Sequence, residues 1–385
     1  MNIILAIIIG ALLLVVIVGL HEAGHFFTAK FFKVKVDEFG FGFPPRIWGK
    51  KMGETIYSIN AIPAGAFVRL FGEEGEGPKN PRSFAAKGPW VRAAIIAAGV
   101  VMNIIVAFVL FSLLLASGGF RSDTPVSMPF SGETIDIQFP FGEQQDGVLI
   151  TGVLAGSPAE KAGLQGLDKV EAINGQEITS NEQLIKIINE NKDKVVNVSL
   201  YNILDRKSKK LSVIPSGEKP ADKGTIGIAI DKVVTIRYKS LAEKVFSGPA
   251  HSVNMLALQN RAIGDLFGKA FREKTVAPVK DNLRGPIGIV ALLGISIGSL
   301  GGMAGFWLTI QIVALISLIL GVINILPIPA LDGGRLFFTL FEGVTGRKVN
   351  EQVERLIHTV GFVVLILVFL VVSFYDIDFL IRFFR

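Results

Sequence analysis

Four long apolar runs dominate the pattern of the chain. They lie at residues 3–20, 93–117, 305–326 and 357–374, and each is close to the roughly 20 residues that an α-helix needs to cross a bilayer core of about 30 Å. The first run has no basic residue before it and is too long for the apolar part of a cleavable signal peptide. The pattern therefore predicts a mainly α-helical membrane protein with four transmembrane helices.

The pattern changes after the first run. Residues 57–71 (YSINAIPAGAFVRLF) are rich in residues that favour strands, and residues 39–51 (FGFGFPPRIWGKK) carry glycines and prolines that mark turns. This segment predicts a β-hairpin or small sheet. Many of its side chains are apolar or aromatic, which suits a sheet that dips into the membrane face. The alternative is an ordinary cytoplasmic hairpin, and the pattern favours neither.

A compact α+β domain is predicted at residues 146–216, where the chain reads as strand, short helix, strand, Asn-Gly turn, helix and strand. Residues 240–272 have apolar side chains at helical spacing, which predicts helices that lie on the membrane surface or pack on this domain. Residues 285–302 are apolar but interrupted by glycine. They form either a fifth span or an interfacial or re-entrant segment that leads into the third span. We favour the interfacial or re-entrant segment, because a fifth span would break the asymmetry of basic residues between the two sides of the membrane that is described next.

The distribution of charge orients the predicted helices. The net charge is +6, but the basic residues lie next to the apolar runs, so the excess of Lys and Arg in cytoplasmic loops explains them better than nucleic-acid binding does. Residues 30–92 carry 11 Lys or Arg against 6 Asp or Glu. We expect this loop and the basic loop at 327–356 in the cytoplasm, and residues 118–304 and both termini outside.

The segment HEAGH (21–25) follows the first apolar run directly. On a helix, His21 and His25 are one turn apart and project from one face, as two ligands of a single metal ion must. Neutral imidazole suits zinc, and the chain has no cysteine that could offer a thiolate. Glu22 lies beside this face, where its carboxylate can act as a general base on a water molecule. The alternative is a polar helix end at the cytoplasmic boundary.

Asp332, in the segment NILPIPALDGGRL (324–336), is the candidate for a third metal ligand. A carboxylate at the end of an apolar span costs several kcal/mol unless it is paired or binds a metal. The two prolines break the helix, which is tolerated in a membrane only against protein or a water-filled cavity. The alternative is a helix cap beside the two glycines. His251 is predicted on the opposite side of the membrane, and His358 has no ligand-like neighbours.

These two segments together resemble the site-2 protease family of intramembrane zinc metalloproteases, in the branch of the regulator of sigma-E protease. Residues 56–73, 80–103 and 331–342 are also similar to that branch. The resemblance implies that His21, His25 and Asp332 bind one zinc ion and that Glu22 is the general base. It implies that Asn324 holds the substrate or polarises its carbonyl, for which an interhelical hydrogen bond is the alternative. For Asn103 we favour such an interhelical bond.

The resemblance also implies a substrate-binding role for the predicted hairpin, whose edge would pair with an unwound substrate. The residues implied are Gly40, Gly42, Phe67, Val68 and Arg69. The chain departs from the family pattern at three positions, which bear on hairpin geometry and substrate preference. Pro44 stands where the family usually has glycine, Ala66 replaces the second glycine of a Gly-Gly pair, and Val100 replaces a proline.

The external domain resembles a bacterial PDZ domain on the segments SPAEKAGL and VEAINGQEI. PDZ domains add an extended peptide to a sheet edge beside a helix, which we expect near residues 149–153 and 181–189. Leu167 stands where glycine is usual. Whether the groove binds a peptide or only excludes bulky substrates is left open. Only one such domain fits the chain, as in the single-PDZ members of the family.

The predicted layout is a first span with HEAGH at 1–30, a membrane-associated hairpin and loop at 31–92, a second span at 93–117, the PDZ domain at 146–216, amphipathic or interfacial helices at 240–304, a third span with the LDG segment at 305–340, and a fourth span at 357–375.

The sequence therefore predicts a zinc endopeptidase of the bacterial inner membrane. Its partners would be the lipid bilayer and single-span membrane proteins, cut on the cytoplasmic side after another protease has removed their external domain. The resemblance implies anti-sigma factors or remnant signal peptides as the substrates. A catalytically silent PDZ scaffold would have a broken metal site. A transporter would show inverted repeats, and a soluble-type zincin anchored by one helix would hold its HExxH segment in a polar domain.

Overall fold

The computed structural model describes residues 3–73, 79–127, 133–216, 225–282, 285–300 and 302–383. The chain divides into two compact units, considered separately below: unit 1 is Met1–Leu110, Arg284–Gly301 and Thr309–Arg385, and unit 2 is Phe111–Leu283 and Gly302–Leu308.

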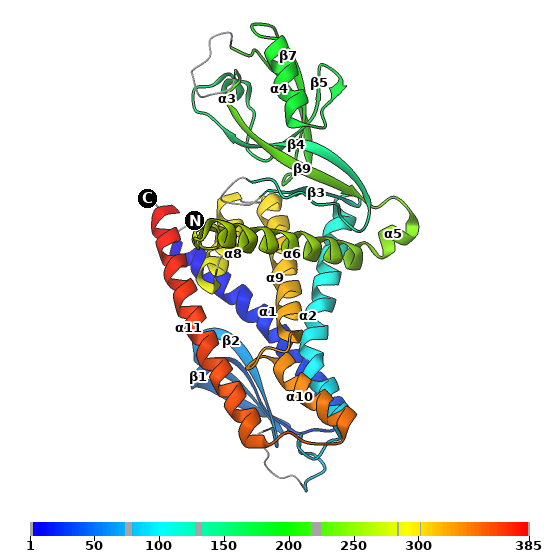
Figure 1. Ribbon diagram of the computed structural model, residues 1–385, viewed down its shortest axis with the longest axis vertical. Coiled ribbons are helices and arrows are strands. Elements are labelled where there is room, and N and C mark those ends of the chain that lie inside the picture. Colours follow the sequence, from blue (N-terminus) through cyan, green and yellow to red (C-terminus); the bar gives the residue numbers. More distant parts are fainter. Residues whose placement is uncertain are drawn as a thin grey trace. The chain divides into compact units, whose positions relative to one another are not determined.

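The long helices match the predicted spans (Figure 1). They are α1 (Ile3–Phe31), α2 (Pro89–Ser117), α9 (Gly302–Ile325) and α11 (Glu351–Phe383). Among the described residues, these 4 helices are long and apolar enough to cross a membrane. The prediction of four transmembrane helices is thereby confirmed.

The first span, predicted at residues 1–30 with HEAGH inside it, agrees with α1, which continues past its apolar run to Phe31. One detail of the predicted spans differs. The predicted span at 305–340 is two helices, because α9 ends at Ile325 and α10 (Asp332–Thr345) begins six residues later. The prolines of the intervening segment cannot continue a helix.

Helix α8 (Pro286–Leu300) packs against α1 and α11. Its contact with α1 is so close that a Cβ on Gly10 would lie 2.0 Å from the carbonyl oxygen of Val290. Asp376 of α11 accepts hydrogen bonds from the backbone N–H groups of Gly285, at 3.0 Å, and Gly288, at 2.9 Å. A buried carboxylate from one helix therefore caps the N-terminus of another.

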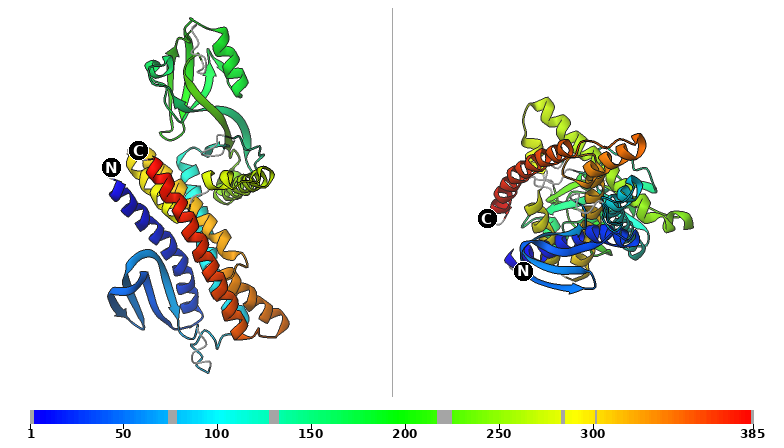
Figure 2. Two further views of the ribbon diagram at one scale, coloured as in Figure 1. Left: turned by 60° about the vertical axis from the view of Figure 1, so that its left-hand side comes forward. Right: turned by 90° about the horizontal axis from the view of Figure 1, so that it is seen from below.

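The predicted hairpin is confirmed as β1 (Val36–Met52) and β2 (Thr55–Leu70), which lie beside α1 in Figure 1 and in the left view of Figure 2. Each of these long strands folds back on itself. Phe39 of β1 lies between Val68 and Tyr57 of β2 and pairs with both. Tyr57 in turn lies between Phe39 and Lys50 of β1. Residues 66–70 therefore form an edge of the sheet, next to the segment 36–41.

Unit 2 contains a sheet with the strand order β3-β9-β4-β5-β7-β8, and β6 pairs with β5. The strands are β3 (Arg121–Pro125), β4 (Glu143–Val153), β5 (Asp168–Ile173), β6 (Gln176–Glu177), β7 (Val196–Asn202), β8 (Lys207–Val213) and β9 (Ile228–Arg237). Two helices, α3 (Pro158–Ala162) and α4 (Asn181–Glu190), cover it. The order of elements predicted for 146–216 matches, but β3 and β9 lie outside those limits, so the predicted domain is too short for its sheet.

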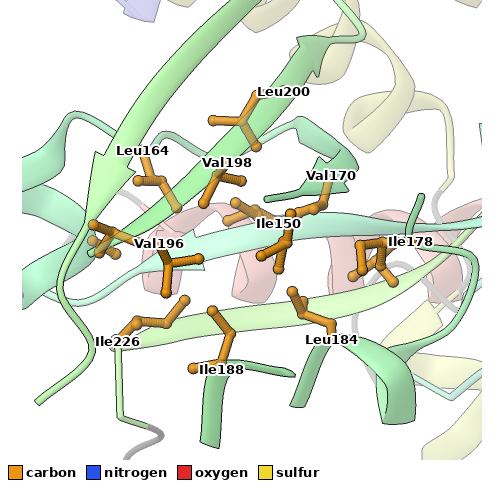
Figure 3. Packing of buried hydrophobic residues seen from close by; sticks show 14 residues of the cluster. Ile150, Leu164, Val170, Ile178, Leu184, Ile188, Val196, Val198, Leu200 and Ile226 are labelled. Atoms are coloured by element: carbon orange, nitrogen blue, oxygen red, sulfur yellow. The ribbon is translucent and has the colours of Figure 1, made fainter. Parts of the chain in front are cut away.

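The core of this sheet is a cluster of buried aliphatic side chains, drawn in Figure 3. Ile150, Val170 and Leu200 come from three strands, and Leu184 and Ile188 from α4. The alternation of apolar and polar residues in each strand places the apolar set on this one face. Burial of these side chains holds α4 on the sheet.

Two turns in unit 2 bear on the sequence analysis. Asn174 and Gly175 both have positive φ, 50° and 85°, as the predicted two-residue Asn-Gly turn requires. Leu167 has φ 68°, so the position where glycine is usual keeps its left-handed conformation although leucine occupies it. A left-handed non-glycine residue costs about 1–2 kcal/mol.

The prediction that the strand near residues 149–153 is the sheet edge that accepts a peptide is wrong. Leu149 of β4 pairs with Lys169 of β5 and with Asp231 of β9, so β4 is an inner strand. The part of β9 from Ile228 to Asp231 pairs only with β4 among the described residues, because β3 covers β9 from Val233 onward. Helix α4 contacts β9, so the sheet edge that lies beside α4 belongs to β9.

Residues 240–282 form helices α5 (Leu241–Val245), α6 (Ser247–Glu273) and α7 (Ala277–Asn282). His251 of α6 is fully buried, where its Nδ1 lies 3.3 Å from the hydroxyl of Tyr238 and its ring packs edge-on to Phe111. Asn254 donates to the same hydroxyl. Burial lowers the pKa of His251 to about 4.

Unit 2 should lose stability in acid because of His251. The unfolded chain, with an ordinary pKa near 6.5, binds a proton before the folded chain does, so stability is full above about pH 6.5 and falls as the pH drops toward 4. We expect a loss of about 3 kcal/mol in the free energy of unfolding over this range. Urea unfolding of the full chain at several pH values measures it. The variant His251→Asn should lack this part of the slope, and an unchanged slope would contradict the assignment.

Truncation of the unit 2 core should be costly. Leu200→Ala, at a side chain with 0% exposure, should lower the free energy of unfolding by about 2–5 kcal/mol. Val195→Ala, at a side chain that is 58% exposed, should change it by less than about 0.5 kcal/mol. Protease digestion of the full chain at increasing urea compares the two, and equal midpoints would show that this cluster is not the core.

Candidate metal centre

Glycines allow α1 and α2 to meet beside the two histidines. A Cβ on Gly24 of α1 would lie 2.3 Å from the carbonyl oxygen of Ala98, and a Cβ on Gly99 of α2 would lie 2.4 Å from Nε2 of His25. Any side chain at either position would push the helices apart. The backbone of α2 thus forms one wall of the site.

The structure brings the three predicted ligands together in unit 1. Nε2 of His21 lies 2.8 Å from Oδ2 of Asp332, Nε2 of His25 lies 3.2 Å from the same oxygen, and the two Nε2 atoms are 3.2 Å apart. A tetrahedral zinc ion with bonds of about 2.0–2.1 Å needs ligand atoms roughly 3.3 Å apart. Both histidines are buried. The donor atoms, their spacing and their burial therefore fit a zinc ion.

Helix α2 fixes the rings of both histidines. Nδ1 of His25 donates to the carbonyl oxygen of Ile95 at 2.8 Å, which places the ring proton on Nδ1 and leaves Nε2 free for a metal. Nδ1 of His21 lies 3.2 Å from the amide of Asn103, whose Oδ1 is otherwise without a partner. Rotating that amide by 180° lets Oδ1 accept from Nδ1–H of His21, the tautomer that leaves Nε2 of His21 free for a metal.

Asn103 therefore does more than the interhelical contact that its sequence context suggested. Its backbone carbonyl accepts a hydrogen bond from Ser317 of α9 at 3.0 Å, which is such a contact. Its side chain also reaches His21. The sequence signal for this contact was an asparagine within an apolar span. That signal does not identify the residue to which the amide forms a hydrogen bond.

Glu22 links the helix to the edge of the hairpin. Its carboxylate accepts a hydrogen bond from the backbone N–H of Val68 at 2.9 Å, and the ligand atoms of His21, Glu22 and His25 lie within 4.8 Å of one another. Of the hairpin residues predicted to bind substrate, Val68 is the one with a hydrogen bond to this cluster among the described residues.

The other predicted hairpin residues serve the sheet itself. The ring of Phe67 covers Gly40, where a Cβ would lie 2.4 Å from it, and Gly42 has a positive φ of 77°. Arg69 forms an ion pair at 3.0 Å with Glu38, which also pairs with Arg46 at 2.6 Å. Glu38 is only 3% exposed, and sequence reasoning missed it although it is an acid within an aromatic strand.

Two further residues complete the description of the site. Asn324 is half-buried near the end of α9, and among the described residues no hydrogen bond joins its side chain to the cluster. Arg335, one turn beyond Asp332 on α10, forms an ion pair at 2.5 Å with Glu73, at the end of the hairpin. Helix α10 and the hairpin are thereby joined next to the predicted metal ligands.

Comparison with known proteins agrees with this geometry. The chain is 32% identical over 381 residues to a provisionally named zinc metalloprotease of Clostridium acetobutylicum, with 98% of each chain covered. It is 26% identical over 443 residues to the regulator of sigma-W protease RasP of Bacillus subtilis, with 94% of this chain and 96% of that protein covered. It is 30% identical over 362 residues to a provisionally named zinc metalloprotease of a Nostoc species, with 92% and 90% covered.

Residues 9–368 match the model of peptidase family M50. This confirms the resemblance drawn from the two motifs, and with it the expectation of a membrane metalloprotease that uses zinc. The chain belongs to peptidase family M50.

Proposed function

We propose that this protease cuts the transmembrane segment of single-span membrane proteins, with one zinc ion held by His21, His25 and Asp332. The observation that carries the proposal is the cluster of three ligand atoms, 2.8–3.2 Å apart. His21 and His25 supply two of them from α1, a helix long and apolar enough to cross a membrane, and Asp332 supplies the third from the start of α10. Two buried imidazoles and a partly buried carboxylate in such surroundings are costly unless they bind something. A catalytically silent scaffold has no need of this arrangement.

The residues of the chain divide the work of peptide hydrolysis. Zinc, when bound, polarises the scissile carbonyl and makes water a better nucleophile. The Glu22 carboxylate takes one proton from the attacking water and passes it to the nitrogen of the leaving amine as the C–N bond breaks. Ile95 and Asn103 keep the ring protons of His25 and His21 on Nδ1, so that each Nε2 faces the metal.

The hairpin edge supplies what a helical substrate lacks. A helix hides its peptide groups in its own hydrogen bonds, so the substrate must unwind and find new partners for them. The edge segment 66–70, with Phe67, Val68 and Arg69, offers strand pairing directly beside Glu22. Gly40 and Gly42 support this edge from the neighbouring segment. Asn324 would add a hydrogen-bond donor for the scissile carbonyl or for the substrate backbone.

The remaining parts of the proposal concern substrate and location. The similarity to RasP, a regulator of sigma-W, favours anti-sigma factors as substrates, with remnant signal peptides as the second class. The protein would act in the bacterial inner membrane after a first cleavage outside, with its metal near the cytoplasmic face. The sheet of unit 2 would be a single extracytoplasmic PDZ domain that excludes bulky substrates or binds a peptide between β9 and α4.

Replacing the base should abolish cleavage but spare the metal. We expect Glu22→Gln to cut a model single-span substrate, lacking its external domain, at least about 100-fold more slowly than the wild type. Zinc content should be unchanged, because Glu22 is not a ligand. Cleavage by both proteins would contradict the role of Glu22. The absence of zinc from both would support a scaffold.

The backbone N–H of Val68 should matter more than its side chain. Val68→Ala keeps the N–H and should retain most activity, whereas Val68→Pro removes it and should lower cleavage at least about 10-fold, with zinc still bound. Parallel cleavage assays and zinc analysis of the two variants test this. Equal activity in both would exclude the edge at Val68 from the reaction.

A further inference from the structure

Asp332 follows a segment of turns that contains a left-handed residue. Residues 326–331 join α9 to α10, with the N–H of Ile328 donating to Leu326 at 2.6 Å and the N–H of Leu331 donating to Ile328 at 3.2 Å, and Ala330 has φ 75°. An alanine in this left-handed region costs on the order of 1–2 kcal/mol. The conformation persists only if the surroundings hold it, and a shift of Ala330 would move Asp332, two residues further along.

Helix α11 holds this segment through His358. The backbone N–H of Ala330 donates to Nδ1 of His358 at 2.9 Å. Because an N–H group can only donate, Nδ1 carries no proton, and the ring is the neutral tautomer protonated at Nε2. The imidazole thus faces a backbone amide and is not turned toward the metal ligands.

The same side chain also touches the helix that follows Asp332. A Cβ on Gly334 would lie 3.2 Å from Cε1 of His358, and the ring of Phe338 stands edge-on to the imidazole with centroids 5.8 Å apart. One turn along α11, a Cβ on Gly361 would lie 2.4 Å from Cβ of Pro329. Helix α11 therefore contacts the chain on both sides of Asp332, and α10 lies beside that end of α11 in Figures 1 and 2.

We propose that His358 is a positioning residue that aims Asp332 at the zinc ion through its hydrogen bond to Ala330. The inference rests on the proposed ligand set. The groups around the imidazole that carry charge are Glu354, on its own helix, and Arg335 on α10; Arg335 is already paired with Glu73. The hydrogen bond to Ala330 is the contact of His358 that bears directly on the ligand-bearing segment.

Metal affinity and the spectrum of bound cobalt test the proposal without relying on cleavage. We compare the full-length wild type with His358→Leu, which fills similar space but accepts no hydrogen bond. His358→Asn places an amide oxygen near the position of Nδ1. Thr359→Ala, at an exposed neighbour on α11, is the control for the helix, and Asp332→Ala is the control for the ligand. Zinc dissociation constants come from competition with a chromophoric chelator, and Co²⁺ reports coordination through its visible absorption.

We expect His358→Leu to weaken zinc binding about 10–100-fold, as the loss of an outer-shell partner typically does, and to diminish the intense absorption of tetrahedral cobalt. His358→Asn should restore both to near the wild-type values, and Thr359→Ala should change neither. Wild-type affinity and spectrum in His358→Leu would overturn the proposal, as would equal losses in the Leu and Asn variants. If Asp332→Ala itself bound zinc as tightly as the wild type, the proposed ligand set would be wrong instead.

Discussion

Asp332 can reach the two imidazoles of α1 only because the chain stops being helical before it. Helix α9 ends at Ile325 and α10 starts at Asp332, so the carboxylate projects from the first turn of a new helix. Three polar groups in a hydrophobic environment are costly apart and favourable together, most of all around a cation. The glycines at 24 and 99 and the bonds from Ile95 and Asn103 serve the same end, since each fixes where a histidine nitrogen lies.

The hairpin is attached to this centre by contacts with α1 and α10. Its edge segment donates from Val68 to Glu22, and its end holds α10 through Glu73 and Arg335. Helix α11 holds the other side of the ligand-bearing segment through His358 and Gly361. Glu22, His21, His25 and Asp332 are therefore each held by a contact with at least one other element. Such fixation keeps catalytic groups close to their working geometry.

Sequence patterns predicted the parts of the molecule that depend on local composition. Apolar run length gave the four candidate spans, and the spacing of His21 and His25 gave a shared helix face. The LDG segment gave Asp332, since a carboxylate there needs a partner. The patterns failed where tertiary contacts decide. The peptide-accepting strand was misplaced because β9, which lies more than 70 residues beyond β4 in sequence, pairs along it. The neighbours of Asn103, Glu38 and His358 carry no local signal.

Zinc X-ray absorption spectroscopy of the purified full-length protein tests the central claim most directly, because it reads the ligand set itself. The account predicts one zinc ion with two imidazole nitrogens, shown by their outer-ring scattering, and oxygen donors at about 2.0–2.2 Å completing a coordination number of four. Three imidazoles would mean that another histidine replaces Asp332. A shell of oxygen donors without imidazole scattering would mean that the ion binds elsewhere, and either result would contradict a centre built from His21, His25 and Asp332.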